Sequence, residues 1–434
     1  MRIGMEHALT LPRNVSNWVT CPISVHVIRP RWIAKLIREP LDMGCIPQYA
    51  QSSGLRQAAG SNPAPNARRE GRTTMSHHFD TQVAKDDSRL NVLDMYIFEG
   101  AAPQTTAMIL TTNPDAGIFA PLTLHPEGLY AFRFDTNGDG IADIAFKFVF
   151  EEPRHLDGDD SHHEQRFRVL RAVGGELPGH EGELLVEGVV GETVRTARGI
   201  QAYVGRAAEL WAADAFGFFT VVNGIFVDHR YPTTAFDRKS NLFAGRNNMA
   251  TVLEVPNSLL GADRVEAWAT VSLFGHAPEV QVYRWGLPLF THLLLSDPRA
   301  PELAARFHQT APWEDSQLFR TAVTNFVQTF ADIGGQISHP ADYASTLIPR
   351  LVPAVLPYQI GSTAEFCTTR FNGRPLASDA FDVMLTVASG TPISDGVAPD
   401  VSRIRTEFPY CGIPYDDTEQ AGMRPLRELI GLSY

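Results

Sequence analysis

The sequence is poor in cysteine and has no long apolar run. Its 434 residues include four cysteines, Cys21, Cys45, Cys367 and Cys411, which are too few and too widely spaced for a disulfide framework or a zinc knuckle. No apolar stretch reaches the roughly 18–20 residues of a membrane span, and the first residues lack the basic, apolar and small-residue order of a secretory signal. We therefore expect a cytoplasmic protein without a membrane partner.

The sequence also lacks the motifs of several enzyme classes. It contains no nucleophile elbow, no phosphate-cradling glycine loop, no HExxH zinc helix and no dinucleotide fingerprint. No nucleotide cofactor is therefore indicated, and no catalytic residue follows from spacing alone. The formal net charge of −12 argues against a nucleic-acid partner, because such surfaces need clustered Lys and Arg.

Charge divides the chain near Met75. Residues 1–74 contain ten Lys and Arg against four Asp and Glu, a net of +6. Subtracting these from 37 basic and 49 acidic residues leaves 27 and 45 in residues 75–434, a net of −18. Prolines interrupt the first segment, and its end is rich in Ser, Gly, Ala, Asn and Arg. We expect the working protein to begin at or near Met75 and Met1 to be a mis-assigned start, because 68–72 can be encoded by a purine-rich ribosome-binding sequence. The alternative is that 1–74 is a disordered arm.

Residues 75–434 alternate short β-type runs with turn residues, and helical patterns are fewer. They predict a single globular domain that is mainly β, with sandwich- or barrel-like antiparallel sheets and several peripheral helices, α+β overall. A soft seam is expected near 296–315. The predicted strands are 95–98, 107–111, 129–134, 144–150, 167–173, 184–190, 218–222, 250–255 and 265–273, and the predicted helices are 202–213, 301–306, 315–329 and 379–388.

An acidic segment between two predicted strands is the most specific local motif. Its oxygen-bearing side chains stand at positions 1, 3, 5 and 9, and they are Asp135, Asn137, Asp139 and Asp143. With Gly140 at position 6, this spacing matches the front of a calcium loop, but Phe146 replaces the closing glutamate, so the segment is no EF-hand. Asn-Gly and Asp-Gly are also preferred in metal-free hairpin turns. Both interpretations, a structural Ca²⁺ site and a bare turn, are open at this point.

A second set of candidate ligands lies near the start of the domain. His77, Asp87 and Asp94 combine imidazole with carboxylate, and such a set suits iron, manganese or zinc. The alternative is structural: His77 begins an exposed segment, and the two aspartates cap turns around the strand at 95–98.

Several blocks of the body form a recognisable series. They are 76–78, 87–98, 129–140, 251–256, 268–270, 286–289, 373–376, 382–385, 395–397 and 408–410, and they cover nearly all of 75–434 and none of 1–74. Taken together, these blocks resemble a bacterial family known only as domain of unknown function 4331. The resemblance implies a globular protein of unassigned activity. Ser88 and Asn91 stand where that family usually has proline and aspartate, which weakens a carboxylate site there.

Two functions are compatible with these patterns. The first is a β-rich module, calcium-stabilised or not, that binds a small ligand or a protein partner. The second is a metal-dependent enzyme that acts on a small molecule, with His77, Asp87 and Asp94 as ligands of iron, manganese or zinc and an open coordination position. We favour the first, because no catalytic constellation meets a spacing test.

Overall fold

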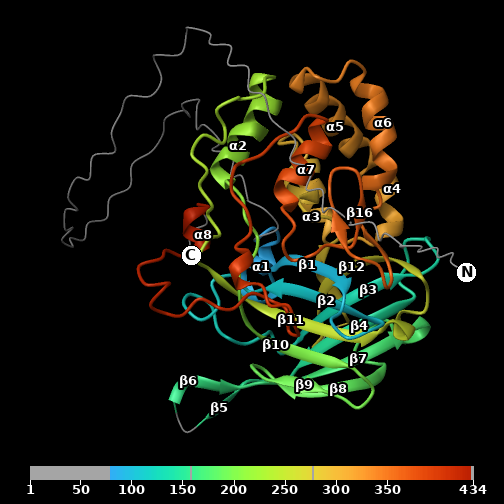
Figure 1. Cartoon of the computed structure of the whole chain (residues 1–434), viewed down its shortest axis with the longest axis vertical. Coiled ribbons are helices and arrows are strands. Elements are labelled where there is room, and N and C mark those ends of the chain that lie inside the picture. The colour runs from blue at the N-terminus through green and yellow to red at the C-terminus, as the bar shows by residue number, and fades with distance from the viewer. Residues whose placement is uncertain (1–78, 157–158, 276–277, 432–434) are drawn as a thin grey trace, which may run out of the picture. The chain divides into compact units, whose positions relative to one another are not determined.

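A computed structural model describes residues 79–434 of the chain, apart from 157–158, 276–277 and 432–434 (Figure 1). The chain divides into two units, 1–68 and 69–434, and the description below concerns the second. The predictions for residues 1–74, and the candidate ligand His77, lie outside the described residues.

One sheet has five strands in the order β1-β2-β11-β10-β9, and every neighbouring pair is antiparallel. Its strands carry apolar residues on both faces: in β11, Met249 and Leu253 point to one hydrophobic cluster, whereas Ala250 and Val252 point to another. Both faces of this sheet are therefore covered. The strands are β1 (Val92–Glu99), β2 (Thr105–Thr112), β9 (Thr193–Arg195), β10 (Gln201–Ala208) and β11 (Asn247–Pro256).

The other large sheet has seven strands, six of them in the order β13-β12-β3-β4-β7-β8, with β14 also paired to β12. The β3–β4 hairpin places Phe132 opposite Phe146, and these rings belong to the same cluster as Met249 and Leu253 of the first sheet. The facing sides of the two sheets thus share one core. The strands are β3 (Gly128–Asp135), β4 (Ile144–Phe150), β7 (Arg166–Val173), β8 (Glu183–Val189), β12 (Arg264–Leu273), β13 (Val280–Trp285) and β14 (Leu356–Gln359).

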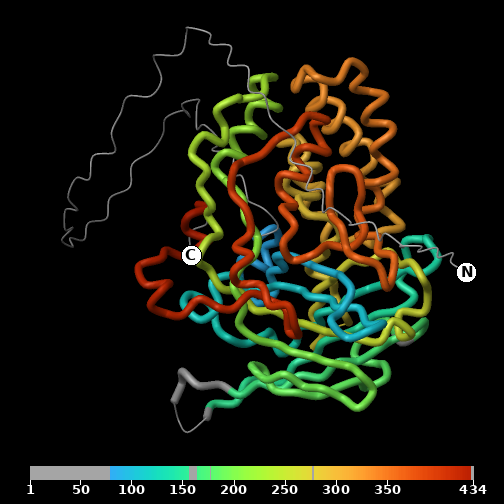
Figure 2. Tube along the Cα trace, viewed as in Figure 1, coloured from blue at the N-terminus to red at the C-terminus, as the bar shows by residue number. Residues whose placement is uncertain are grey.

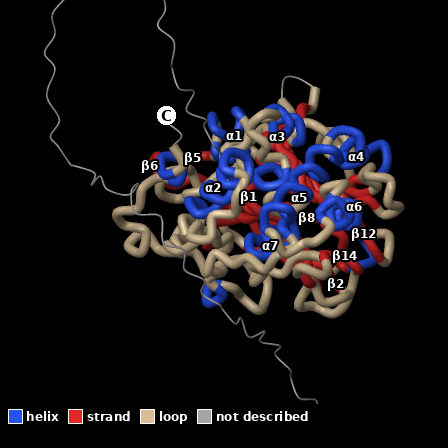
Figure 3. Tube along the Cα trace, turned by 90° about the horizontal axis from the view of Figure 1, so that it is seen from above, coloured by secondary structure: helices blue, strands red, loops and turns tan. Residues whose placement is uncertain are grey.

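The longer helices gather on one side of the sheets, where α5 packs on α6 and α7 (Figures 1 and 3). No helix in the described ranges is long and apolar enough to cross a membrane. The α-helices are α1 (Gln82–Asp86), α2 (Ala215–Asn223), α3 (Glu302–Phe307), α4 (Asp315–Leu318), α5 (Arg320–Gly334), α6 (Pro340–Leu351), α7 (Ala380–Ser389) and α8 (Leu426–Leu429). Two π-helices are η3 (Gly224–Asp228) and η5 (Phe290–Leu294).

Short elements complete the described chain. They are the strands β5 (Arg154–Leu156), β6 (Asp159–Glu164), β15 (Glu365–Phe366) and β16 (Phe371–Asn372), and the 3-10 turns η1 (Ser88–Leu90), η2 (Gly174–Glu176), η4 (Asn257–Leu260), η6 (Pro312–Glu314) and η7 (Val401–Arg403).

The C-terminal part of the chain returns to the five-stranded sheet (Figure 2). Arg374 donates its backbone N–H to the carbonyl of Ile97 across 2.9 Å, and Ala208 donates to the carbonyl of Gly412 across 3.0 Å. Phe408 and Tyr410 pack with Tyr96 in the second hydrophobic cluster, which also contains Ala250 and Val252. This segment therefore covers the face of the sheet that points away from the seven-stranded sheet.

The predicted fold class is confirmed. Both large sheets are antiparallel, and several helices pack beside them. The sheets are open, with β1 and β9 at the ends of one and β13 and β8 at the ends of the six-strand path, so the arrangement is sandwich-like.

Two local predictions were wrong. The β-branched and aromatic run at 218–222 is helical in α2, because Asp214 caps the helix by accepting the N–H of Gly217 and Phe218 packs on Phe381 of α7. The alanine-rich run that begins at 202 is strand β10, because its partners β9 and β11 supply hydrogen bonds on both edges. In both cases tertiary contacts override the local propensity.

Candidate functional site

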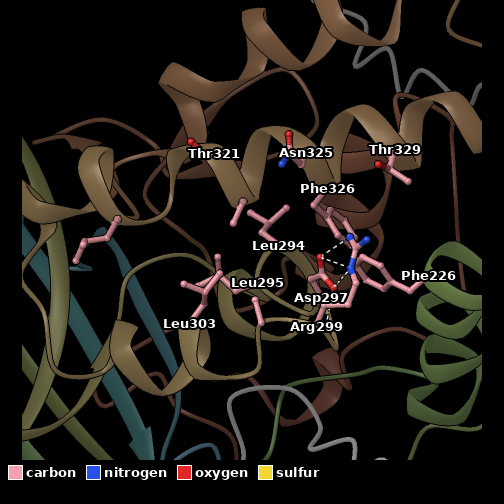
Figure 4. A pocket seen from close by; sticks show the side chains of 13 residues that line it. Phe226, Leu294, Leu295, Asp297, Arg299, Leu303, Thr321, Asn325, Phe326 and Thr329 are labelled. Atoms are coloured by element: carbon pink, nitrogen blue, oxygen red, sulfur yellow. Dashed lines mark hydrogen bonds and ion pairs between the residues drawn. The ribbon is translucent and has the colours of Figure 1, made fainter.

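A cavity of about 330 Å³ lies between α5 and the chain that follows η5 (Figure 4). Its volume falls within the range of small-molecule sites. Thirteen residues line it: Phe226, Leu294, Leu295, Asp297, Arg299, Ala300, Leu303, Leu318, Thr321, Ala322, Asn325, Phe326 and Thr329.

The floor of the cavity is apolar and continuous with the main core. Leu294, Leu295 and Phe326 are almost wholly buried, and Phe226 and Leu303 pack against the same hydrophobic cluster. The rings of Phe226 and Phe326 lie 5.8 Å apart, centre to centre. A ligand on this floor would exchange water for aliphatic and aromatic carbon, which is the main source of affinity in small-molecule sites.

One wall of the cavity presents a row of neutral polar side chains. Thr321, Asn325 and Thr329 follow one another at intervals of four residues along α5, so they share one face of the helix (Figure 4). Thr321 and Asn325 are exposed and Thr329 is half-buried, and among the described residues no hydrogen bond joins these three side chains to another protein group. They can therefore exchange hydrogen bonds with water for hydrogen bonds with a bound molecule.

The two charged residues of the lining neutralise each other. Arg299 holds Asp297 in a two-pronged ion pair, with Nη2 2.7 Å from Oδ2 and Nε 2.9 Å from Oδ1. The hydrogen bonds from Arg299 lower the pKa of Asp297, which is therefore ionised at neutral pH. The Arg299 side chain is 82% exposed, so this pair stands at the solvent side of the cavity.

Both π-helices of the described chain contribute to this cavity. Phe226 belongs to η3 and Leu294 to η5. Each π-helix is flanked by a non-glycine residue with a left-handed backbone, His229 at φ 48° after η3 and Leu289 at φ 56° before η5. Such helical irregularities and unfavourable backbone conformations concentrate at functional sites.

A buried trio of ionisable side chains is attached to the same segments. Asp80, which precedes α1, lies 2.8 Å from Nε2 of His292 in η5 and 2.9 Å from Nε2 of His308, directly after α3. Thr291 donates its hydroxyl to Asp80 across 2.8 Å. Burial alone would raise the pKa of Asp80, but the charge and hydrogen bonds of His292 and the hydrogen bond of His308 hold it well below its usual range.

Further contacts position the two histidine rings. Nδ1 of His292 lies 3.0 Å from the hydroxyl oxygen of Thr291. Nδ1 of His308 lies 3.1 Å from the carbonyl oxygen and 3.3 Å from the backbone nitrogen of Arg284. The Asp80 carboxylate is therefore the shared partner of two imidazole rings that other groups hold in place.

The predicted acidic loop is the tip of the β3–β4 hairpin. Asp135 accepts backbone N–H groups from Asn137, Gly138 and Gly140 at 2.6–2.8 Å. Asp143 accepts both the N–H and the hydroxyl of Thr136. Gly140 has φ +78°, and a Cβ there would lie 2.6 Å from the backbone nitrogen of Trp313, so glycine is required. Ca²⁺ binding by Asp135, Asn137, Asp139 and Asp143 stays a prediction.

Asp87 and Asp94 lie in different surroundings. Asp87 caps η1 and pairs with Arg89 at 2.6 Å, and these contacts outweigh burial and lower its pKa. Asp94 is buried and ion-paired with Arg374, whose guanidinium carbon stands 4.3 Å from the centre of the Tyr96 ring. Within the described ranges, no three His, Cys, Asp or Glu side chains are placed to hold a metal ion. The transition-metal site with His77 stays a prediction.

Sequence reasoning missed the cavity and the trio. Asp80 lies more than 200 positions before His292 and His308 in the sequence, so no local spacing indicates that the three residues meet. The row on α5 was visible in principle, because 321, 325 and 329 follow the four-residue spacing of one helix face.

Comparison of the chain with models of known protein families, with curated proteins and with solved structures finds no match. The described part of the chain is thus a globular, β-rich domain with two antiparallel sheets and a lined cavity. Kinship with the domain of unknown function 4331 family rests on the sequence blocks and is a proposal.

Proposed function

We propose that this domain binds a small molecule in the cavity between α5 and the π-helices η3 and η5. The observation that carries the proposal is the combination, in one cavity, of a buried apolar floor with three polar side chains that bond to no other protein group among the described residues, Thr321, Asn325 and Thr329. Binding sites for small molecules combine these two features, since apolar contact supplies affinity and a few polar groups set orientation.

The size of the cavity favours a small molecule over a protein partner. A volume of about 330 Å³ equals that of about eleven water molecules at roughly 30 Å³ each, or a ligand of about ten to fifteen non-hydrogen atoms. The left-handed residues His229 and Leu289 beside the π-helices support the same site, because such conformations persist where function maintains them.

A cavity-filling variant tests the proposal. Ala322 lies in the cavity wall on α5, and we expect Ala322→Trp to abolish the rise in melting temperature that small amphiphilic compounds produce. Ala322→Leu fills less of the space and should weaken the same effect. Ala305→Trp is the matched control, because Ala305 is exposed on α3 and does not line the cavity. Compounds that stabilise all three variants equally would contradict binding at this site.

A further inference from the structure

Charge is cancelled at the cavity. Asp297 and Arg299 are the two charged members of the lining, and they are paired through three side-chain contacts of 2.7–3.2 Å, with a further hydrogen bond from the Arg299 backbone N–H. An anionic ligand would meet an Arg299 guanidinium whose charge Asp297 already compensates, and a cationic ligand would meet an Asp297 carboxylate whose charge Arg299 already compensates. The attraction of the cavity for either charge is therefore weakened.

The surroundings do not make up for this weak attraction. A charged group resting on Leu294, Leu295 and Phe326 would lose its hydration against buried hydrocarbon. For an anion the field of the acidic body adds repulsion, since residues 75–434 carry 27 basic and 45 acidic side chains, a net of −18.

The row on α5 offers neutral hydrogen bonds instead. Thr321, Asn325 and Thr329 span eight residues of helix, which corresponds to about 12 Å at 1.5 Å per residue. A threonine hydroxyl and an asparagine amide can each donate and accept, so the row fits hydroxyl, carbonyl or amide groups in either orientation. The same cavity is lined by apolar side chains such as Leu295 and Phe326.

We infer that the ligand is an electrically neutral, elongated and mostly apolar molecule with hydroxyl, carbonyl or amide groups on one edge. Its apolar side lies on the leucine and phenylalanine floor, and its polar edge follows Thr321, Asn325 and Thr329. This inference rests on the proposed function and specifies the class of molecule that the site selects.

A matched series of probes tests the charge selection. Octanol, octanoate and octylammonium share one eight-carbon chain and differ in the charge of the head group, and calorimetric titration at low salt gives their affinities. We expect octanol to bind at least about tenfold more tightly than octanoate or octylammonium, because the charged heads lose hydration in the site. Octanoate or octylammonium binding as tightly as octanol, with loss on Ala322→Trp, would overturn the ligand class and leave the proposed function standing.

Two variants of the ion pair sharpen the test. Asp297→Asn releases Arg299, so octanoate should gain about three- to tenfold in affinity while octanol changes little. Arg299→Gln leaves Asp297 without its partner, so octylammonium should gain by a similar factor. An unchanged preference in both variants would show that the pair does not set selectivity, and would overturn the inference.

The row on α5 has a matched control on the same helix. Thr321→Val and Asn325→Leu should each weaken octanol binding about two- to tenfold, the effect of losing a neutral hydrogen bond. Thr324→Val should not, because Thr324 does not line the cavity and its hydroxyl donates to the Arg320 carbonyl. Equal effects in Thr321→Val and Thr324→Val would overturn the polar edge. If no probe loses affinity on Ala322→Trp, the proposed function itself fails.

Discussion

His292 lies with its Nε2 atom 2.8 Å from Oδ1 of Asp80, which connects the π-helix η5 to the chain just before α1. The other carboxylate oxygen contacts His308, at the end of α3. The segments held in this way supply Leu294 and Leu303 to the cavity. Asp80, which is far from these segments in the sequence, thus helps to position two walls of the cavity.

Replacing Asp80 should destabilise the fold strongly. Asp80→Asn removes the buried carboxylate that both histidines contact, and breaking a buried pair costs about 3–5 kcal/mol of unfolding free energy. Urea unfolding measures this loss. Asp86→Asn is the control, because Asp86 is exposed and contacts Gln82 alone among the described hydrogen bonds. A loss below about 1 kcal/mol for Asp80→Asn would show that this carboxylate does not hold the three segments together.

Stability should fall as pH rises toward neutrality. Burial and the nearby Asp382 charge raise the pKa of Asp379 to about 7, and burial together with Asp382 and Asp214 raises that of Asp395 to about 6. Unfolded aspartates titrate near pH 4, so the folded state retains protons that the unfolded state has released. The resulting stabilisation is complete below about pH 4 and is lost as pH rises through about 6 to 7.

Unfolding free energies between pH 5 and 8 test this dependence. Asp379→Asn keeps a side-chain oxygen that can cap α7, as Asp379 now does by accepting the N–H of Asp382, and it removes the titration. We therefore expect a flatter pH profile for Asp379→Asn and an unchanged profile for Asp332→Asn, which alters an exposed position on α5. A wild-type profile that rises between pH 5 and 8 would refute the prediction.

The buried pair of Asp94 and Arg374 should be sensitive to a change that keeps the charge. Lysine cannot reproduce the planar guanidinium that lies over Tyr96 and also reaches Ser378 across 3.2 Å. We expect Arg374→Lys to lower the unfolding free energy by about 2–4 kcal/mol. Arg370→Lys, at an exposed residue 3.9 Å from Glu365, should change it by less than about 0.5 kcal/mol. Similar losses in both variants would show that the guanidinium geometry is unimportant.

Metal binding at the hairpin tip is decided by the response to calcium. Asp135→Ala should destabilise the hairpin with or without metal, because Asp135 accepts three backbone N–H groups. A Ca²⁺ site predicts a further rise in wild-type melting temperature on adding calcium, which Asp139→Ala removes.

Analysis of the purified protein for iron, manganese and zinc, repeated with His77→Ala, tests the second predicted site. No bound metal and no calcium response would reject both.

Local signals predicted the hairpins and one helix well. The strands β3 and β4 flank a turn that contains Asn-Gly and Asp-Gly. Strand periodicity and turn preferences depend on residues close together in the chain, so the sequence reveals them. Helix α7 begins after Asp379, which caps it, and its observed range agrees with the predicted helix at 379–388. Where both faces of an element are buried, as in β10, the period is lost, and local patterns no longer distinguish strand from helix.

The sequence by itself determined the antiparallel, β-rich character of the domain and the position of the acidic turn, because both depend on interactions between residues close in the chain. The tertiary structure decided where the candidate site lies. Phe226, Leu294 and Phe326 meet only after α2, η5 and α5 have packed, and Asp80 reaches His292 across more than 200 residues. Contacts at such separations depend on burial and charge compensation in the whole core. Neither produces a pattern in the local sequence from which the contacts could be predicted.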